Sequence, residues 1–248
     1  MSTEAPRARP KSTLAILQPG YLPWLGFFDQ VRRADAFVYY DDVQYDKHGW
    51  RNRNRVKSTS GEPHWLTVPV RHSGLEWPSV REVEIDRRTP WARKHMGTLR
   101  QFYGRAPFAS RYLPELDELL HRPWERIVDL DLALIQKLCD WLSLTAPRYR
   151  SSELGVAGER MARLVALCQR VGADRYLTGD AARSYLDTDL FTRSGITVEW
   201  QAYRHPVYPQ LHGEFVPYLS VVDLLLNCGD ESGAILARSG PEERDGIG

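Results

Sequence analysis

The sequence lacks the features that mark several large classes of protein. Its 33 Lys and Arg residues balance 32 Asp and Glu residues, so the chain has no overall basic field of the kind that nucleic-acid-binding proteins use. No run approaches the roughly 20 apolar residues needed to cross a bilayer. Residues 1–13 lack the apolar core of a secretory signal. These absences favour a globular protein of the cytoplasm.

Cysteine is scarce, and its spacing argues against two kinds of site. The three cysteines, Cys139, Cys168 and Cys228, form no CxxC pair and no Cys/His ligand pattern. Neither a disulfide framework nor a structural zinc site is therefore indicated, and a reducing compartment is the natural one. The chain also has no HxxxH pair and no GxSxG, P-loop, GxGxxG or kinase signature.

What the sequence does contain is the composition of one ordinary globular domain. Of its 248 residues, 42% are hydrophobic and 26% are charged, enough for one sizeable core. We expect a single α/β domain at residues 12–232, with a helical subdomain at about 91–171. Residues 1–11 are predicted to be a disordered tail, and residues 233–248 a mobile one.

A strand–helix–strand pattern opens the domain. Residues 14–17 are apolar and end at Gln18-Pro19-Gly20, residues 23–33 have helical spacing, and residues 36–40 are rich in β-forming side chains. This order is typical of a parallel βαβ unit. Open sheets of this class bind ligands at the carboxyl ends of their strands.

Two carboxylates, Asp41 and Asp42, directly follow the second strand. Adjacent residues of an extended chain point to opposite faces, so at most one of them can face a given pocket. That carboxylate could act as a general base, hold a substrate amine or ligate Mg²⁺. A turn cap is the simpler alternative. Because Gln44 and Tyr45 lie beside them, we favour the site.

Arginine and asparagine alternate from Arg51 to Arg55. In an extended chain, the arginines would share one face and the asparagines the other. Guanidinium groups on one face suit a phosphate or carboxylate, which Arg binds in a bidentate manner. A solvated edge strand is one alternative, and nucleic-acid binding is a further one that the balanced net charge and the shortness of the patch disfavour.

His205 is the first choice for proton transfer, because histidine has an unperturbed pKa near neutrality. With Asp41 and Asp42 it completes the predicted catalytic set. The residues predicted to bind substrate are Gln18, Tyr21, Trp24, Gln44, Tyr45, Trp50, Asn52, Arg53, Asn54, Arg55, Tyr208 and Gln210. We expect residues 18–24, 40–55 and 205–210 to meet around one cleft.

Several motifs together resemble the WbqC-like protein family. They are QPxYxPWxGFF from Gln18, YYDDVQYxKxGWxNRNR from Tyr39, WLTVPV from Trp65, YLTGxxxxxYLD from Tyr176 and HPVYPQxxGEFVPYLSVVDLLLNCG from His205. The opening strand–helix–strand segment is also similar to pantothenate synthetase and other HUP-type folds. Their His-x-Gly-His signature is absent, since residues 21–26 read YLPWLG. The resemblances imply a parallel-sheet, Rossmann-like (HUP-like) core with an inserted or appended helical subdomain.

The family resemblance implies a role in cell-surface polysaccharide or secondary-metabolite biosynthesis. Our first hypothesis is a transferase that forms an amide on an amino sugar or related amine. Asp42 or His205 would accept the proton, and Arg53 would hold a phosphate or carboxylate. The acyl donor could be acyl-CoA, a carrier protein or aminoacyl-tRNA, with Mg²⁺ as an optional cofactor. The alternatives are a non-catalytic protein that binds a sugar nucleotide or assists assembly, and an ATP-using ligase or nucleotidyltransferase of HUP type.

Overall fold

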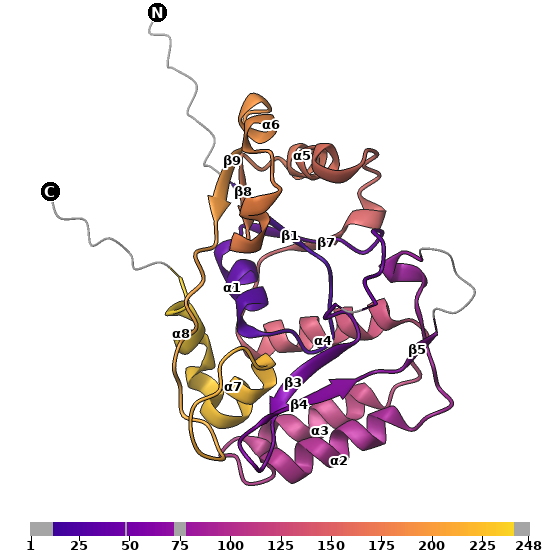
Figure 1. The fold of residues 1–248 in the computed structure, drawn as a ribbon, viewed down its shortest axis with the longest axis vertical. Helices are drawn as coiled ribbons and strands as arrows, with labels where there is room; N and C mark the ends of the chain where they lie inside the picture. The colour runs from indigo at the N-terminus through magenta and orange to yellow at the C-terminus, as the bar shows by residue number, and fades with distance from the viewer. Residues whose placement is uncertain (1–11, 48, 72–77, 241–248) are drawn as a thin grey trace, which may run out of the picture.

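A five-stranded parallel sheet forms one layer of the molecule. The computed structural model describes residues 12–47, 49–71 and 78–240. The sheet has the strand order β7-β2-β1-β8-β9, and every neighbouring pair is parallel. It crosses the upper part of Figure 1. Its strands are β1 (Thr13–Leu17), β2 (Ala36–Tyr39), β7 (Arg148–Arg150), β8 (Arg175–Thr178) and β9 (Thr197–Trp200).

Helices cover both faces of this sheet. The α-helices of the described chain are α1 (Leu25–Arg33), α2 (Trp91–Tyr103), α3 (Ala109–Leu120), α4 (Ile127–Trp141), α5 (Arg160–Val171), α6 (Thr188–Arg193), α7 (Val221–Cys228) and α8 (Ser232–Ala237). The predicted α/β fold with a parallel, Rossmann-like core is confirmed.

The alternating side chains of β1 show which helices cover which face of the sheet. Ala15 packs in the core cluster that contains Phe28 of α1, whereas Leu14 and Ile16 pack in the cluster that contains Val165 of α5. Successive side chains of a strand point to opposite faces, so α1 and α5 cover opposite sides of the sheet.

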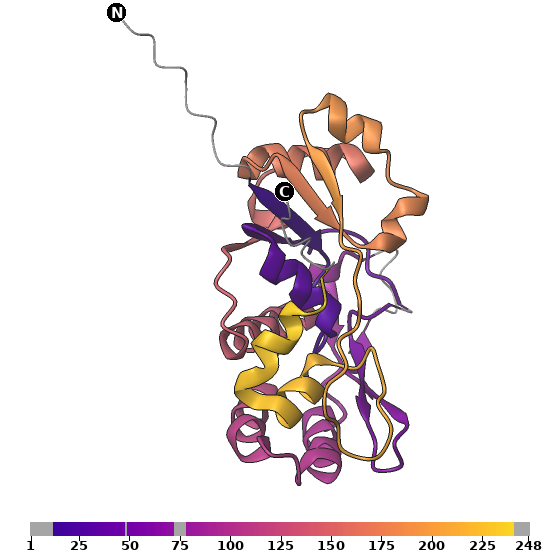
Figure 2. The ribbon, with the colours of Figure 1, turned by 90° about the vertical axis from the view of Figure 1, so that its left-hand side faces the viewer.

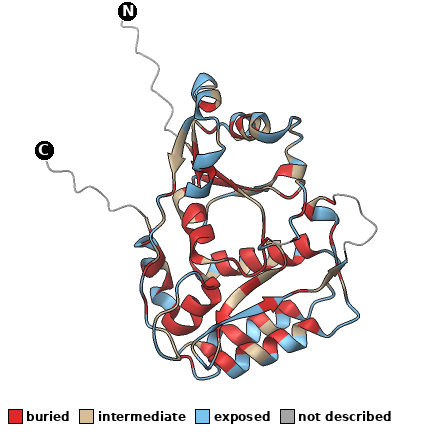
Figure 3. Cartoon of the chain, viewed as in Figure 1, coloured by how far each residue is buried: buried red, intermediate tan, exposed pale blue. Residues whose placement is uncertain are grey.

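A second layer joins the sheet to a group of helices. The hairpin of β3 (Arg53–Lys57) and β4 (Pro63–Thr67) lies beside α2, α3 and α7, as Figures 1 and 2 show. A shorter pair, β5 (Val70–Arg71) and β6 (Glu84–Ile85), lies farther along the chain. Buried residues continue through α4 and α7 in Figure 3, so the larger core spans both layers.

The helical layer has different limits from those predicted. Helices α2 to α4 lie in it, but β7 joins the main sheet and α5 packs on that sheet, so the predicted limit at residue 171 is replaced by one near residue 141. The mobile tail predicted from residue 233 starts too early, because α8 buries Ile235 and Leu236. Residues 241–248, like the tail predicted at residues 1–11, lie outside the described residues. Periodicity alone gives a helix but not the layer on which it packs. No helix of the described residues is long and apolar enough to cross a membrane.

Asp223 ties the last helices to the hairpin. Its fully buried carboxylate accepts hydrogen bonds from the hydroxyls of Tyr103 (2.7 Å) and Tyr208 (2.9 Å) and from Nε2 of Gln210 (2.8 Å). Lys57 of β3 is equally buried, and its ammonium donates to the carbonyl oxygen of Glu214 (2.5 Å). Buried polar groups of this kind are stable only when they are fully hydrogen-bonded.

Asp223→Ala is expected to lower the free energy of unfolding by about 3 kcal/mol, since three buried donors lose their acceptor. Asp230→Ala removes the exposed partner of Arg111 and should cost less than about 1 kcal/mol. Urea denaturation followed by circular dichroism measures both. Equal losses for the two variants would contradict the assignment.

Candidate functional site

A pocket of about 900 Å³ opens at the carboxyl ends of the sheet strands. Within the sheet, β2 lies next to β1 on one side, and β8 lies next to β1 on the other side. The point between β1 and β8 is therefore the topological switch point, where open α/β sheets bind ligands. Gln18 follows β1 and Thr178 ends β8, and both line the pocket.

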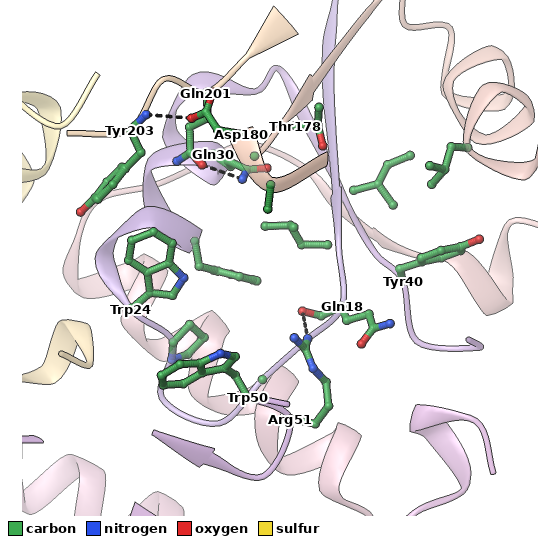
Figure 4. A pocket seen from close by; sticks show the side chains of 18 of the residues that line it. Gln18, Trp24, Gln30, Tyr40, Trp50, Arg51, Thr178, Asp180, Gln201 and Tyr203 are labelled. Atoms are coloured by element: carbon green, nitrogen blue, oxygen red, sulfur yellow. Dashed lines mark hydrogen bonds between the residues drawn. The ribbon is translucent and has the colours of Figure 1, made fainter. Parts of the chain in front are cut away.

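The pocket has one strongly aromatic wall. Trp24 packs edge-on against Tyr203, with ring centroids 4.8 Å apart, and lies 5.7 Å from Tyr218. Figure 4 shows Trp24, Trp50 and Tyr203 on the same side of the cavity. Gly26 makes room for the indole, because a Cβ atom there would lie 2.2 Å from Cη2 of Trp24. Aromatic rings of this kind bury the apolar face of a sugar or another ring.

One end of the pocket is lined by hydrogen-bond acceptors. Gln201 donates from Nε2 to the carboxylate of Asp29 (3.0 Å) and accepts from Nε2 of Gln30 (2.8 Å). The side-chain oxygen of Gln30, Oε1, is buried and has no hydrogen-bond partner among the described residues. Asp180 lies near this pair in Figure 4, and its carboxylate accepts from the backbone N–H of Tyr203 (3.3 Å) and from Nε of Arg183 (3.0 Å). An unpaired buried acceptor costs about 1–3 kcal/mol, which a ligand donor would recover.

Arg51 provides a cation on the opposite side of the pocket. Its Nη1 donates to the carbonyl oxygens of Gln18 (2.8 Å) and Pro19 (2.9 Å). Asp131 of α4 lies behind it, fully buried, and neither of its carboxylate oxygens has a hydrogen-bond partner in the described chain. Burial raises the pKa of Asp131 well above its ordinary value, although Arg51 opposes the rise. Burial therefore favours the neutral form of Asp131, which would not cancel the charge of Arg51.

Asp41 and Asp42 lie beside the pocket but not in its lining. The carboxylate of Asp41 accepts from Nε of Arg150 (2.7 Å) and from the backbone N–H of Ser152 (3.0 Å). Burial raises the pKa of Asp41, but these hydrogen bonds outweigh it and lower the pKa below its ordinary value. Asp42 pairs with Arg163 of α5. Both carboxylates thus hold neighbouring segments against the sheet.

His205 also lies behind the pocket lining. Its ring is half-buried among aromatic rings and lies 5.0 Å from Tyr218 and 5.8 Å from Tyr203, centroid to centroid. Burial lowers the pKa of His205, so its neutral form is favoured. Tyr208 and Gln210 point to Asp223 instead of the pocket. The pocket lining includes residues of 18–24 and 40–55 but none of 205–210.

The two asparagines of the NRNR run donate hydrogen bonds to backbone carbonyl groups of neighbouring segments. Asn52 donates from Nδ2 to the carbonyl oxygen of Val68 (2.8 Å), and Asn54 donates to that of Leu22 (2.8 Å). Asn54 also contributes to the pocket lining, whereas Arg53 and Arg55 lie on the opposite face of β3. The predicted alternation holds for these four residues. Arg51 precedes the strand and reaches the pocket instead of sharing the face of Arg53.

Three further predicted residues are structural. Tyr21 is fully buried, and its hydroxyl lies 2.9 Å from Nδ1 of His95. Tyr45 is also buried, and its backbone N–H donates to the carbonyl oxygen of Pro78. Gln44 is exposed and forms an isolated β-bridge with Ser79. None of the three lines the pocket.

A protein-family model matches most of the chain. The sequence model of the WbqC-like protein family matches residues 18–235. This protein is a member of the WbqC-like family. It is 37% identical over 221 residues to an uncharacterized protein of Mycobacterium tuberculosis (strain ATCC 25618 / H37Rv), Rv1507c, covering 88% of this chain and 95% of the relative. No solved structure matches the chain.

The family motifs lie at several places around the pocket, and sequence reasoning missed part of the lining. The missed residues come from the ends of β2, β8 and β9, from α1 and α5, and from the loop before α7: Gln30, Tyr40, Arg160, Met161, Leu164, Tyr176, Thr178, Asp180, Tyr185, Gln201, Tyr203 and Tyr218.

Asp131→Asn is expected to flatten the pH dependence of stability. The folded state keeps a proton on Asp131 that the unfolded state releases above about pH 3.9, so the free energy of unfolding falls as pH rises from there toward the folded pKa. Each pKa unit of upward shift contributes about 1.4 kcal/mol to this fall.

Urea titrations between pH 4 and pH 8 measure the effect. Asp140→Asn, an exposed change on the same helix, should retain the pH dependence of the unmodified chain. Identical pH profiles for the two variants would refute the role of Asp131.

Gly26→Ala is expected to displace the Trp24 ring and alter the near-ultraviolet circular dichroism, because the new Cβ would overlap the indole. Gly97→Ala on α2 is the matched control, since nothing lies within 4 Å of a Cβ at that residue. The control should stabilise the helix by about 0.5–1 kcal/mol. An unchanged aromatic spectrum for Gly26→Ala would show that Trp24 does not depend on the glycine.

Proposed function

We propose that this WbqC-like protein is an enzyme that binds an amine-bearing small molecule in the switch-point pocket and transfers an acyl or aminoacyl group to the amine. The observation that carries the proposal is the acceptor-lined end of the pocket, since Asp180 and the unpaired Oε1 of Gln30 both belong to its lining. A substrate amine would donate one hydrogen to each acceptor. A pocket rich in apolar rings with a few convergent polar groups is typical of small-molecule sites.

The reaction follows from the arrangement of charges. The amine nitrogen attacks the acyl carbonyl carbon and forms the C–N bond, while the bond from that carbon to the donor's sulfur or oxygen breaks. Asp180 accepts the proton released by the nitrogen, which is general-base catalysis. Arg51 and Arg160 in the same lining would hold an anionic part of the substrate or donor.

The aromatic wall favours an amino sugar or a related ring as acceptor substrate. Trp24, Tyr203 and Tyr218 offer apolar faces with polar tips, which suits a hydroxylated ring. Family membership supports a place in cell-surface polysaccharide or secondary-metabolite biosynthesis. In this proposal Asp180 takes the role of base that the sequence assigns to Asp42 or His205, because Asp180 alone of the three lines the pocket.

Asp180→Asn is expected to reduce acyl transfer roughly 100-fold or more, as loss of a general base does. Purified protein is incubated with a panel of amino sugars and acyl donors (acyl-CoA, acyl carrier protein and aminoacyl-tRNA), and the amide is detected by mass spectrometry. Asp189→Asn changes an exposed carboxylate of α6 and should retain full activity. No amide with any donor, or equal turnover by both variants, would refute the proposal.

A further inference from the structure

The outer face of the β3–β4 hairpin carries two exposed indoles interleaved with two guanidinium groups. Trp50 and Trp65 are 40% and 43% exposed, with ring centroids 5.2 Å apart. The guanidinium carbon of Arg53 lies 4.7 Å from the centre of Trp65, and that of Arg55 lies 5.4 Å from Trp50. We call these four residues the hairpin platform.

The pairing of the two strands forces this arrangement. Arg55 is directly opposite Trp65 in the antiparallel register, and opposite residues share a face. The alternate residues Asn54, Val56 and Leu66 are buried on the other face. Burial of that face leaves the arginines and Trp65 on the outside. The platform is thus a fixed feature of the fold and not a chance group of flexible side chains.

The platform is continuous with the pocket. Trp50 belongs to the platform and also lines the pocket. Tyr218, which is 48% exposed and lies outside the platform, lines the pocket as well. Arg55 donates from Nη2 to the carbonyl oxygen of Tyr218 at 3.4 Å. A molecule bound on the platform would therefore extend toward the pocket mouth.

The local charge of this segment differs from that of the whole chain. Residues 50–57 contain no acid, and two of their arginines, Arg53 and Arg55, lie on the platform, although the complete sequence is balanced. Indole faces stack on nucleic-acid bases, and arginine pairs with phosphates while its planar group stacks on bases as well. A free nucleotide is normally enclosed by a cavity that buries most of its surface. The open platform instead suits a strand that makes successive shallow contacts.

We propose that the hairpin platform binds single-stranded nucleic acid, with bases stacked on Trp50 and Trp65 and phosphates held by Arg53 and Arg55. The contacts are local, so the interaction does not need an overall basic chain. It also involves no reaction, and it stands whether or not the pocket performs acyl transfer.

Binding of a fluorescein-labelled oligoadenylate, measured by fluorescence anisotropy at low salt, tests the proposal. Trp65→Ala should weaken binding about tenfold, because loss of one stacked base costs about 1–3 kcal/mol. Trp65 does not line the pocket, so the change tests the platform separately. Tyr149→Ala removes a 41% exposed aromatic ring from edge strand β7 and should leave binding unchanged. Trp65→Phe should retain most of the affinity, which controls for folding.

The salt dependence distinguishes phosphate contacts from stacking. Arg55→Gln should reduce the slope of log affinity against log salt by about 0.7, the value for one phosphate of a single strand. Arg122→Gln, an exposed change after α3, should leave the slope unchanged. Absence of oligoadenylate binding by the unmodified protein overturns the proposal. So does binding of a DNA duplex or heparin as tightly as the single strand, since a general anion surface would then explain the affinity.

Discussion

The carbonyl oxygen of Trp50 approaches Gly20 so closely that a Cβ atom on residue 20 would lie 2.6 Å from it. This contact lies in a seam between residues 18–22 and 50–54, where the loop after β1 meets the start of the hairpin. The backbone N–H of Tyr21 donates to the carbonyl oxygen of Arg51, and Arg51 donates back to those of Gln18 and Pro19. Because these bonds join the sheet layer to the hairpin layer, they position the pocket floor and the hairpin platform together.

Buried carboxylates stabilise the molecule on either side of this seam. Asp223 accepts hydrogen bonds from α2 and from the segment before α7, and Asp41 accepts hydrogen bonds from the last residue of β7 and from the segment after it. Each is surrounded by neutral or cationic donors, which is the condition for burying a charge at acceptable cost. Asp131 has no such donor among the described residues, and burial therefore favours its protonated form beside Arg51. An aspartate in this fold therefore either anchors neighbouring segments or favours its neutral form, depending on the groups that face its carboxyl.

The fold was largely predictable because its signals are local. Strands β1, β2, β8 and β9 follow from apolar or alternating runs, and α7 begins after Ser220, whose hydroxyl accepts from the N–H of Val222. Strand β7, with only three residues of sequence RYR, has no such signal and exists through pairing with β2. The same holds for α8, which is short but is held by the packing of Ile235 and Leu236.

The sequence by itself determined the family motifs, the local strand and helix signals of the core, and the alternation of Arg53 and Arg55 with Asn52 and Asn54, since each depends on neighbours within a few residues. Only the tertiary structure decided which polar residues face the pocket. Asp42 and Asp180 both follow a sheet strand, yet only Asp180 faces the pocket, because Arg163 of α5 engages Asp42 outside the lining. Partners more than a hundred residues apart make that choice, and no short pattern in the chain records it.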